Sequence, residues 1–138
     1  MQFATFHDLE DQSIFITGGG SGIGADLTKG FLSQGSKVTF IQRSNPEKFL
    51  IDCKGKYKHE PSFLECDVTN TKELKTALQR TAKKQGPISV LVNNAANDTR
   101  HSLGEFTSEQ WDKTMNVNLK PHFFAAQEVV EGMKKNGG

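Results

Sequence analysis

Residues 16–24 read ITGGGSGIG, and this glycine-rich stretch limits the possible folds more than any other part of the sequence. It follows a β-rich run at 13–17 and leads into a helical pattern in which Ile23, Leu27 and Phe31 form an apolar face. Glycine loses more conformational freedom on folding than other residues do, so this density of glycines indicates tight turning or close approach. A glycine turn between a strand and a helix N-terminus is typical of phosphate binding, because the first helical amides are unpaired.

The turn from Gly18 to Gly24 is therefore predicted to approach the pyrophosphate of a dinucleotide. It does not fit a P-loop, because no Lys followed by Ser or Thr closes any G-x-x-x-x-G pattern. The alternative interpretation is an ordinary glycine-rich turn without a ligand.

Apolar strand-like runs alternate with helical patterns along the rest of the chain. Strands that are apolar almost throughout are typical of a parallel sheet covered on both faces, and the alternation indicates βαβ units. We therefore expect one domain over residues 1–138 with an α/β fold, a doubly wound parallel sheet of the Rossmann type truncated after about four strands. The expected strands are 13–17, 37–41, 62–68 and 88–92.

Ligands of such sheets lie beyond the carboxyl ends of the strands, so the residues that follow each strand are the candidates for binding. Gln42, Arg43 and Ser44 follow the second strand, and no acid is present there to hold the ribose hydroxyls of NAD. The planar guanidinium of Arg43 suits a 2′-phosphate, which favours NADP over NAD. The alternative is a solvated surface arginine.

Polar and small residues follow the third and fourth strands. Asp67-Val68 comes after the third, and Asn93-Asn94-Ala95-Ala96 comes after the fourth. The small residues would let a ligand lie against the backbone, and the asparagine amides can tie neighbouring loops together. The alternative for each of them is a loop cap.

In order and spacing, these motifs resemble the short-chain dehydrogenase/reductase family over nearly the whole chain. The resemblance rests on T-G-x-x-x-G-x-G at 17–24, Asp67-Val68, N-N-A-A at 93–96 and MNVNL at 115–119. It implies that the glycine turn holds the pyrophosphate of NAD(P), that Asp67 holds the adenine amine and that 93–95 line the ribose side. The implied cofactor-binding residues are Thr17, Gly18, Ser21, Gly22, Ile23, Gly24, Arg43, Asp67, Val68, Asn93, Asn94 and Ala95.

Asn118 matches the catalytic asparagine of that family, whose main-chain carbonyl holds a water of the proton relay at a kinked helix. The sequence contains a cause for a kink, because Pro121 has no N–H to donate to the carbonyl of Val117. Thr107 and Gln110 form a capping-box pattern that begins the preceding helix. Without the resemblance, Asn118 is interpreted as a polar residue at a helix junction.

The segment NNAANDTRH, residues 93–101, is similar to that of family members that oxidise aldose sugars at C1. Its closely spaced donors and acceptors suit a polyhydroxylated ligand. The alternative is a solvated loop. The candidate substrate residues are Asn97, Asp98, Arg100 and His101.

The sequence departs from the family in its catalytic groups. The family moves the proton that accompanies the hydride with a serine and a Tyr-x-x-x-Lys pair, but the only tyrosine here, Tyr57, has Pro61 four positions later. We therefore expect the cofactor-binding part of a longer NAD(P)-dependent short-chain oxidoreductase that oxidises the C1 hydroxyl of an aldose or similar polyol. We expect no turnover by residues 1–138 alone. The alternative is a non-catalytic dinucleotide-binding or interaction module.

Composition argues against several other classes of protein. A net charge of +1 gives no electrostatic basis for a nucleic-acid or membrane partner, and no apolar run is long enough to cross a bilayer. Cys53 and Cys66 have neither metal-ligand nor disulfide spacing, so no metal site is expected. We expect a cytoplasmic protein whose substrate is a small-molecule alcohol or carbonyl compound such as a sugar. We expect the full-length protein to form a homodimer or homotetramer.

Overall fold

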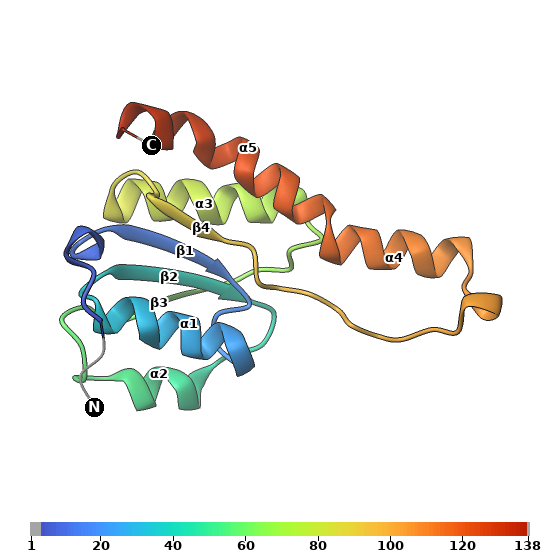
Figure 1. Cartoon of the computed structure of the whole chain (residues 1–138), viewed down its shortest axis with the longest axis horizontal. Helices are drawn as coiled ribbons and strands as arrows, with labels where there is room; N and C mark the ends of the chain where they lie inside the picture. Colours follow the sequence, from blue (N-terminus) through green and yellow to red (C-terminus); the bar gives the residue numbers. More distant parts are fainter. Residues whose placement is uncertain (1–3, 138) are drawn as a thin grey trace.

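A computed structural model describes residues 4–137 and shows one parallel sheet with helices on both faces (Figure 1). The sheet has four strands in the order β3-β2-β1-β4. The strands are β1 (Ser13–Thr17), β2 (Lys37–Gln42), β3 (Ser62–Glu65) and β4 (Val90–Val92). The helices are α1 (Gly22–Ser33), α2 (Glu47–Cys53), α3 (Thr71–Gln85), α4 (Ser108–Asn118) and α5 (Lys120–Lys135), with short 3-10 turns η1 (His7–Leu9) and η2 (Leu103–Glu105). The predicted α/β doubly wound parallel sheet is confirmed.

Two of the predicted strands are shorter than expected. β3 ends at Glu65, opposite Gln42, because the Asp67 carboxylate then accepts hydrogen bonds from Thr69 and turns the chain out of the sheet. β4 begins at Val90, which pairs with Ile14 near the start of β1. Both strands nevertheless leave the sheet at the same edge, which is where the following loops gather.

The two faces of the sheet carry separate hydrophobic clusters. On β1, Ile14 and Ile16 pack toward α1 and α2, whereas Phe15 between them packs toward α3 and α5. All three side chains are fully buried. Alternation along a strand sends successive side chains to opposite faces, so an apolar strand of this kind requires a helical layer on each side.

The predicted apolar face of α1 is only partly correct. Leu27 and Phe31 pack against the cluster, but Ile23 is 76% exposed, and the buried positions are Ala25 and Leu32 together with Thr28. Ile23 is exposed because Gly24, in the first turn of the helix, packs directly on the backbone of the glycine turn. The helix therefore contacts the sheet along the Gly24–Thr28 line, and Ile23 is turned outward.

The predicted helix break before Pro121 is confirmed. α4 ends at Asn118 and α5 begins at Lys120, with Leu119 between them in a non-helical conformation (φ −129°, ψ −53°). The capping box at the start of α4 is also present, because Thr107 Oγ1 accepts from Gln110 N and Gln110 Oε1 accepts from Thr107 N. Figure 1 shows α4 extending away from the sheet while α5 returns over β4 and α3.

Among residues 4–137, no helix has both the length and the apolar character that a membrane span requires.

Leu74→Ala should lower the free energy of unfolding by about 2–5 kcal/mol, because Leu74 is fully buried between α3 and the sheet and its truncation leaves a cavity. Leu103→Ala is the matched control, because Leu103 is 96% exposed, and it should change stability by less than about 0.5 kcal/mol. Urea denaturation followed by circular dichroism measures both. Equal effects of the two substitutions would contradict the position of the core.

Candidate functional site

An open cavity of about 820 Å³ lies beyond the carboxyl ends of the strands, where β1 separates β2 and β3 from β4. The strand order, not the strand direction, reverses at this point, and such a reversal creates the crevice in which doubly wound sheets bind ligands. Loops that follow all four strands contribute to the wall. The predicted site residues on the wall are Gly18, Ser21, Gly22, Ile23, Gly24, Arg43, Asp67, Val68, Asn94, Ala95, Asn97 and Asp98.

The N-terminus of α1 opens into this cavity without a cap. The N-cap residue Ser21 makes no side-chain hydrogen bond to the first turn, so the leading amides of the helix remain available to an anion. Gly22 has φ +50°, and a Cβ atom there would meet nothing within 4 Å, so its Cα faces open space. A backbone that leaves such space and such donors is suited to a phosphate group.

Contacts with β2 and with α1 itself hold the glycine turn in place. Gly18 N donates to Ile41 O (2.7 Å), and the buried Thr28 Oγ1 donates to Gly19 O (2.8 Å). Gly20 N donates to the side-chain Oε1 of Gln42 (3.0 Å). The turn is therefore preorganised before any ligand binds.

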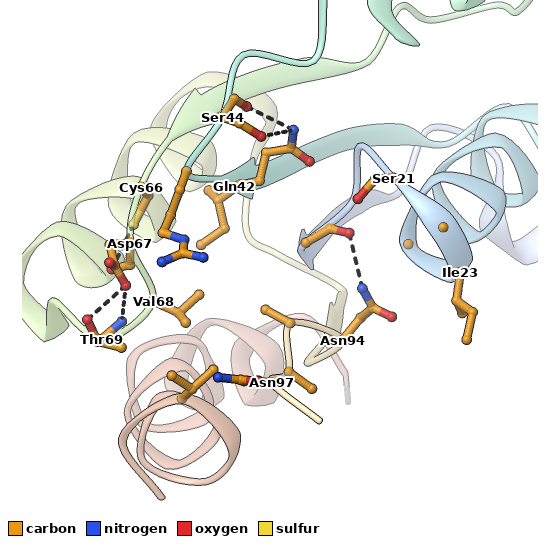
Figure 2. Close-up of a pocket in the computed structure, with 18 of the residues that line it drawn as sticks. Ser21, Ile23, Gln42, Ser44, Cys66, Asp67, Val68, Thr69, Asn94 and Asn97 are labelled. Carbon is orange, nitrogen blue, oxygen red and sulfur yellow. Dashed lines mark hydrogen bonds between the residues drawn. The ribbon is translucent and has the colours of Figure 1, made fainter. Parts of the chain in front are cut away.

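Thr17 joins this turn to the loop after β4. Its hydroxyl oxygen accepts from the amides of Asn94 and Ala95, both at 2.9 Å. Asn94 Nδ2 in return donates to Thr17 O (3.0 Å) and Gly18 O (3.1 Å), and Figure 2 draws one hydrogen bond at the Asn94 amide as a dashed line. Thr17 is only 1% exposed and lies beneath the wall, so its position is that of a support for the cavity. Asn93 also lies off the wall.

Asn118 holds the same loop from the opposite side. Its Oδ1 accepts from Asn97 N (2.7 Å), and its Nδ2 donates to Asn97 O (2.8 Å). In an unbroken helix, His122 N would bond to the Asn118 carbonyl, but it bonds instead to Leu119 O at 3.1 Å. The helix break therefore releases the Asn118 carbonyl, while its side chain fixes the loop, and Val117 beside it lines the cavity.

The four residues predicted to contact the substrate do not all lie at the cavity. Asn97 and Asp98 line the cavity, whereas Arg100 and His101 do not. His101 Nδ1 lies 3.2 Å from Gln110 Nε2, and its ring packs on Phe106 with centroids 5.1 Å apart. This places His101 against the start of α4, away from the wall.

Just after the carboxyl end of β3, the surroundings of Asp67 favour its ionised form. Hydrogen bonds from the Thr69 amide (2.9 Å) and hydroxyl (2.8 Å), with the nearby charge of Arg43, lower the pKa of Asp67 against the opposing effect of partial burial. The neighbouring Cys66 behaves in the opposite way, because burial raises its pKa to about 11 and keeps the thiol protonated. Of these two neighbouring groups, the carboxylate is therefore charged and the thiol is not.

Several wall residues had no binding role of their own assigned from the sequence. Gln42, Ser44, Thr69 and Val117 are four of these, and all line the cavity. Gln42 stands in the segment where an acid would hold the ribose hydroxyls of NAD, and the contact of its amide with Gly20 depends on the fold. Thr69 was detectable, because Asp-x-Thr is a common side-chain turn pattern. By contrast, Tyr57 packs against the α1–α2 cluster and lies off the wall.

Among residues 4–137, no group of three or more His, Cys, Asp or Glu side chains is arranged to hold a metal ion.

A model of the short chain dehydrogenase family matches residues 12–138. The chain belongs to the short chain dehydrogenase family. The sequence-based resemblance is therefore confirmed, and the glycine turn of this chain lies between β1 and α1.

Sugar dehydrogenases are among the relatives of this chain. A D-xylose 1-dehydrogenase of Caulobacter vibrioides is 39% identical over 139 residues, covering 100% of this chain and 54% of that protein. A probable galactose dehydrogenase of Rhizobium meliloti is 39% identical over 136 residues, covering 96% of this chain and 53% of that protein. The chain thus spans about half the length of the curated relatives it matches.

Solved structures agree with the fold. A blue fluorescent protein from a metagenomic library, in complex with NADPH, superposes with a TM-score of 0.82 at 27% identity, covering 91% of this chain and 52% of that one. The aldohexose dehydrogenase of Thermoplasma acidophilum gives a TM-score of 0.80 at 31% identity, covering 94% of this chain and 47% of that one.

Thr17→Val should lower the free energy of unfolding by about 2–3 kcal/mol, because the isosteric side chain leaves the Asn94 and Ala95 amides without their acceptor. Thr17→Ser is the control: it keeps the hydroxyl and should cost only about 1 kcal/mol for the lost methyl group. Thermal and urea unfolding measure both variants. Equal losses would show that the hydroxyl does not support the loop.

Thr69→Ala should raise the pKa of Asp67, because it removes the hydroxyl donor, while the amide donor, which is the larger cause, keeps the pKa below its ordinary value. A lowered folded-state pKa stabilises the fold above the pKa of the unfolded chain, and this stabilisation is lost as the pH falls through the folded-state pKa. Thr69→Ala should therefore weaken the pH dependence of stability in the acidic range.

Carboxyl-carbon NMR titration of Asp67 measures this shift directly. Thr76→Ala is the matched control, because the Thr76 hydroxyl donates to Lys72 O within its own helix. An unchanged pKa in Thr69→Ala, or an equal shift in Thr76→Ala, would contradict the assigned cause.

Proposed function

We propose that residues 1–138 form the dinucleotide-binding part of an NAD(P)-dependent short-chain dehydrogenase. One observation carries the proposal: the uncapped N-terminus of α1 opens into a cavity built from the loops after all four strands. The NADPH complex of a structural neighbour supports it.

The residues of the cavity fit such a cofactor. The leading amides of α1 and the open space at Gly22 suit the pyrophosphate, and the ionised Asp67 carboxylate suits the adenine amine. Asn94 and Ala95 would line the ribose side, with Thr17 and Asn93 behind them. Arg43 carries our preference for NADP, because its guanidinium can pair with a 2′-phosphate.

We further propose that the complete protein oxidises the C1 hydroxyl of an aldose sugar or similar polyol, as the names of its relatives suggest. When bound, the nicotinamide would accept the hydride. Asn97 and Asp98 would orient the substrate from the wall, and the released carbonyl of Asn118 would hold a water of the proton relay. A Tyr-x-x-x-Lys pair, which this sequence lacks, would carry out the proton transfer. We place the complete protein in the cytoplasm, as a homodimer or homotetramer.

A non-catalytic binding or interaction module is the second candidate. It is favoured by large apolar side chains on or beside α5: Leu119 is 54% exposed and Phe123 is 63% exposed. An isolated chain that binds dinucleotide tightly and self-associates without any oxidoreductase partner would favour this candidate over the first.

Gly22→Asp should weaken dinucleotide binding by at least about ten-fold, because it places a negative charge at the phosphate end of α1. Gly22→Asn is the matched control, since Asn and Asp both tolerate a positive φ and differ mainly in charge. Isothermal titration calorimetry with NADP⁺ and NAD⁺ measures the affinities. Equal weakening by Asn and Asp would argue against a phosphate at this position.

The substrate is tested by activity in a longer protein. D-xylose and D-galactose should be oxidised by a protein that continues this sequence with a Tyr-x-x-x-Lys pair, whereas residues 1–138 alone should show no turnover. Failure of every aldose, with retained NADP⁺ binding, would overturn the substrate assignment and leave the cofactor assignment intact.

A further inference from the structure

The side chain of Gln42, the last residue of β2, bonds to two loops at once. Its Oε1 accepts from Gly20 N at 3.0 Å. Its Nε2 donates to Ser44 O at 2.8 Å and lies 3.4 Å from Ser44 Oγ. Figure 2 shows Gln42 between the glycine turn and Ser44, with the dashed contacts to Ser44. One carboxamide therefore joins the turn after β1 to the turn after β2.

The glycine turn packs on this carboxamide as well as bonding to it. A Cβ atom added at Gly20 would overlap the Gln42 side chain and the ring of Phe40. The space between Gly20 and Gln42 is therefore filled, and the hydrogen bond is held by packing.

The two joined turns hold the groups that would touch different parts of one dinucleotide. The glycine turn leads into the N-terminus of α1, which suits the pyrophosphate common to NAD and NADP. The Arg43–Ser44 turn carries the guanidinium that suits the 2′-phosphate, the group present only in NADP. Gln42 lies between the two and fixes the carbonyl of Ser44, the residue next to Arg43.

We propose that Gln42 is a positioning residue that couples the glycine turn to the Arg43–Ser44 turn and thereby sets the discrimination between NADP and NAD. The inference rests on the proposed dinucleotide-binding function. Gln42 acts through Gly20 and Ser44, by fixing the distance between the pyrophosphate subsite and Arg43.

The two ends of the carboxamide can be separated by substitution. Gln42→Glu keeps an acceptor for Gly20 N but has no donor for Ser44 O, and it adds negative charge beside the 2′-phosphate subsite. Gln42→Ala removes both contacts. Gln34→Ala is the matched control, because Gln34 also bridges two backbone groups, Phe6 N and Ala4 O, outside the cavity.

The test measures the affinities of the purified chain and its variants for NADP⁺ and NAD⁺ by calorimetry, with circular dichroism to establish that each variant is folded. Loss of a positioning hydrogen bond corresponds to about a five-fold effect. Gln42→Ala should lower the preference for NADP⁺ over NAD⁺ by about five-fold, and Gln42→Glu should lower it further. Gln34→Ala should leave the preference unchanged.

Hydrogen exchange at the Gly20 amide provides a readout that needs no nucleotide. Protection should be lost in Gln42→Ala and retained in Gln42→Glu and Gln34→Ala. Equal weakening of NADP⁺ and NAD⁺ binding in Gln42→Ala, or an unchanged preference, would overturn the coupling role. If the wild-type chain bound neither nucleotide, the proposed function itself would fail and the inference with it, which is a distinguishable result.

Discussion

The hydroxyl of Thr17 is the contact on which the rest of the cavity depends. It lies at the end of the central strand and accepts hydrogen bonds from two amides of the loop after β4. Because β1 lies between β2 and β4 in the sheet, a support at its carboxyl end can reach both the glycine turn and the asparagine loop. A buried acceptor that serves two donors is expensive to remove, so the two loops are fixed relative to one another.

Other polar side chains around the cavity also fix loops by hydrogen bonding to backbone groups. Asn94 returns two bonds to the end of β1, and Asn118 fixes Asn97 from the C-terminus of α4. Gln42 performs the corresponding task on the β2 side. Loops that leave one sheet edge carry many unpaired backbone groups, and these amides and hydroxyls satisfy them without occupying the cavity.

The fold could be predicted because its signals are local and repeated. Apolar strands alternating with helical patterns, the glycine turn, the capping box at Thr107 and the break at Pro121 each depend on neighbouring residues. The contacts of Gln42 with Gly20 and of Asn118 with Asn97 join residues about twenty positions apart, so no local pattern shows them. The outward position of Ile23 was missed for a similar reason, because the packing of Gly24 on the glycine turn sets the helix rotation.

Buried polar atoms that have hydrogen-bond partners and those that lack them lie in different parts of the molecule. Among the described residues, the buried side-chain atoms without partners are Asn93 Oδ1 and His122 Nε2. Asn93 follows β4, the strand at the sheet edge beyond β1, and His122 lies in the first turn of α5, the helix that packs on β4. Unpaired buried polar atoms are costly, whereas the polar side chains that end β1 and β2, Thr17 and Gln42, have hydrogen-bond partners. The glycine-turn side of the cavity is thus held by its own hydrogen bonds, whereas the two unpaired atoms lie on the β4 side.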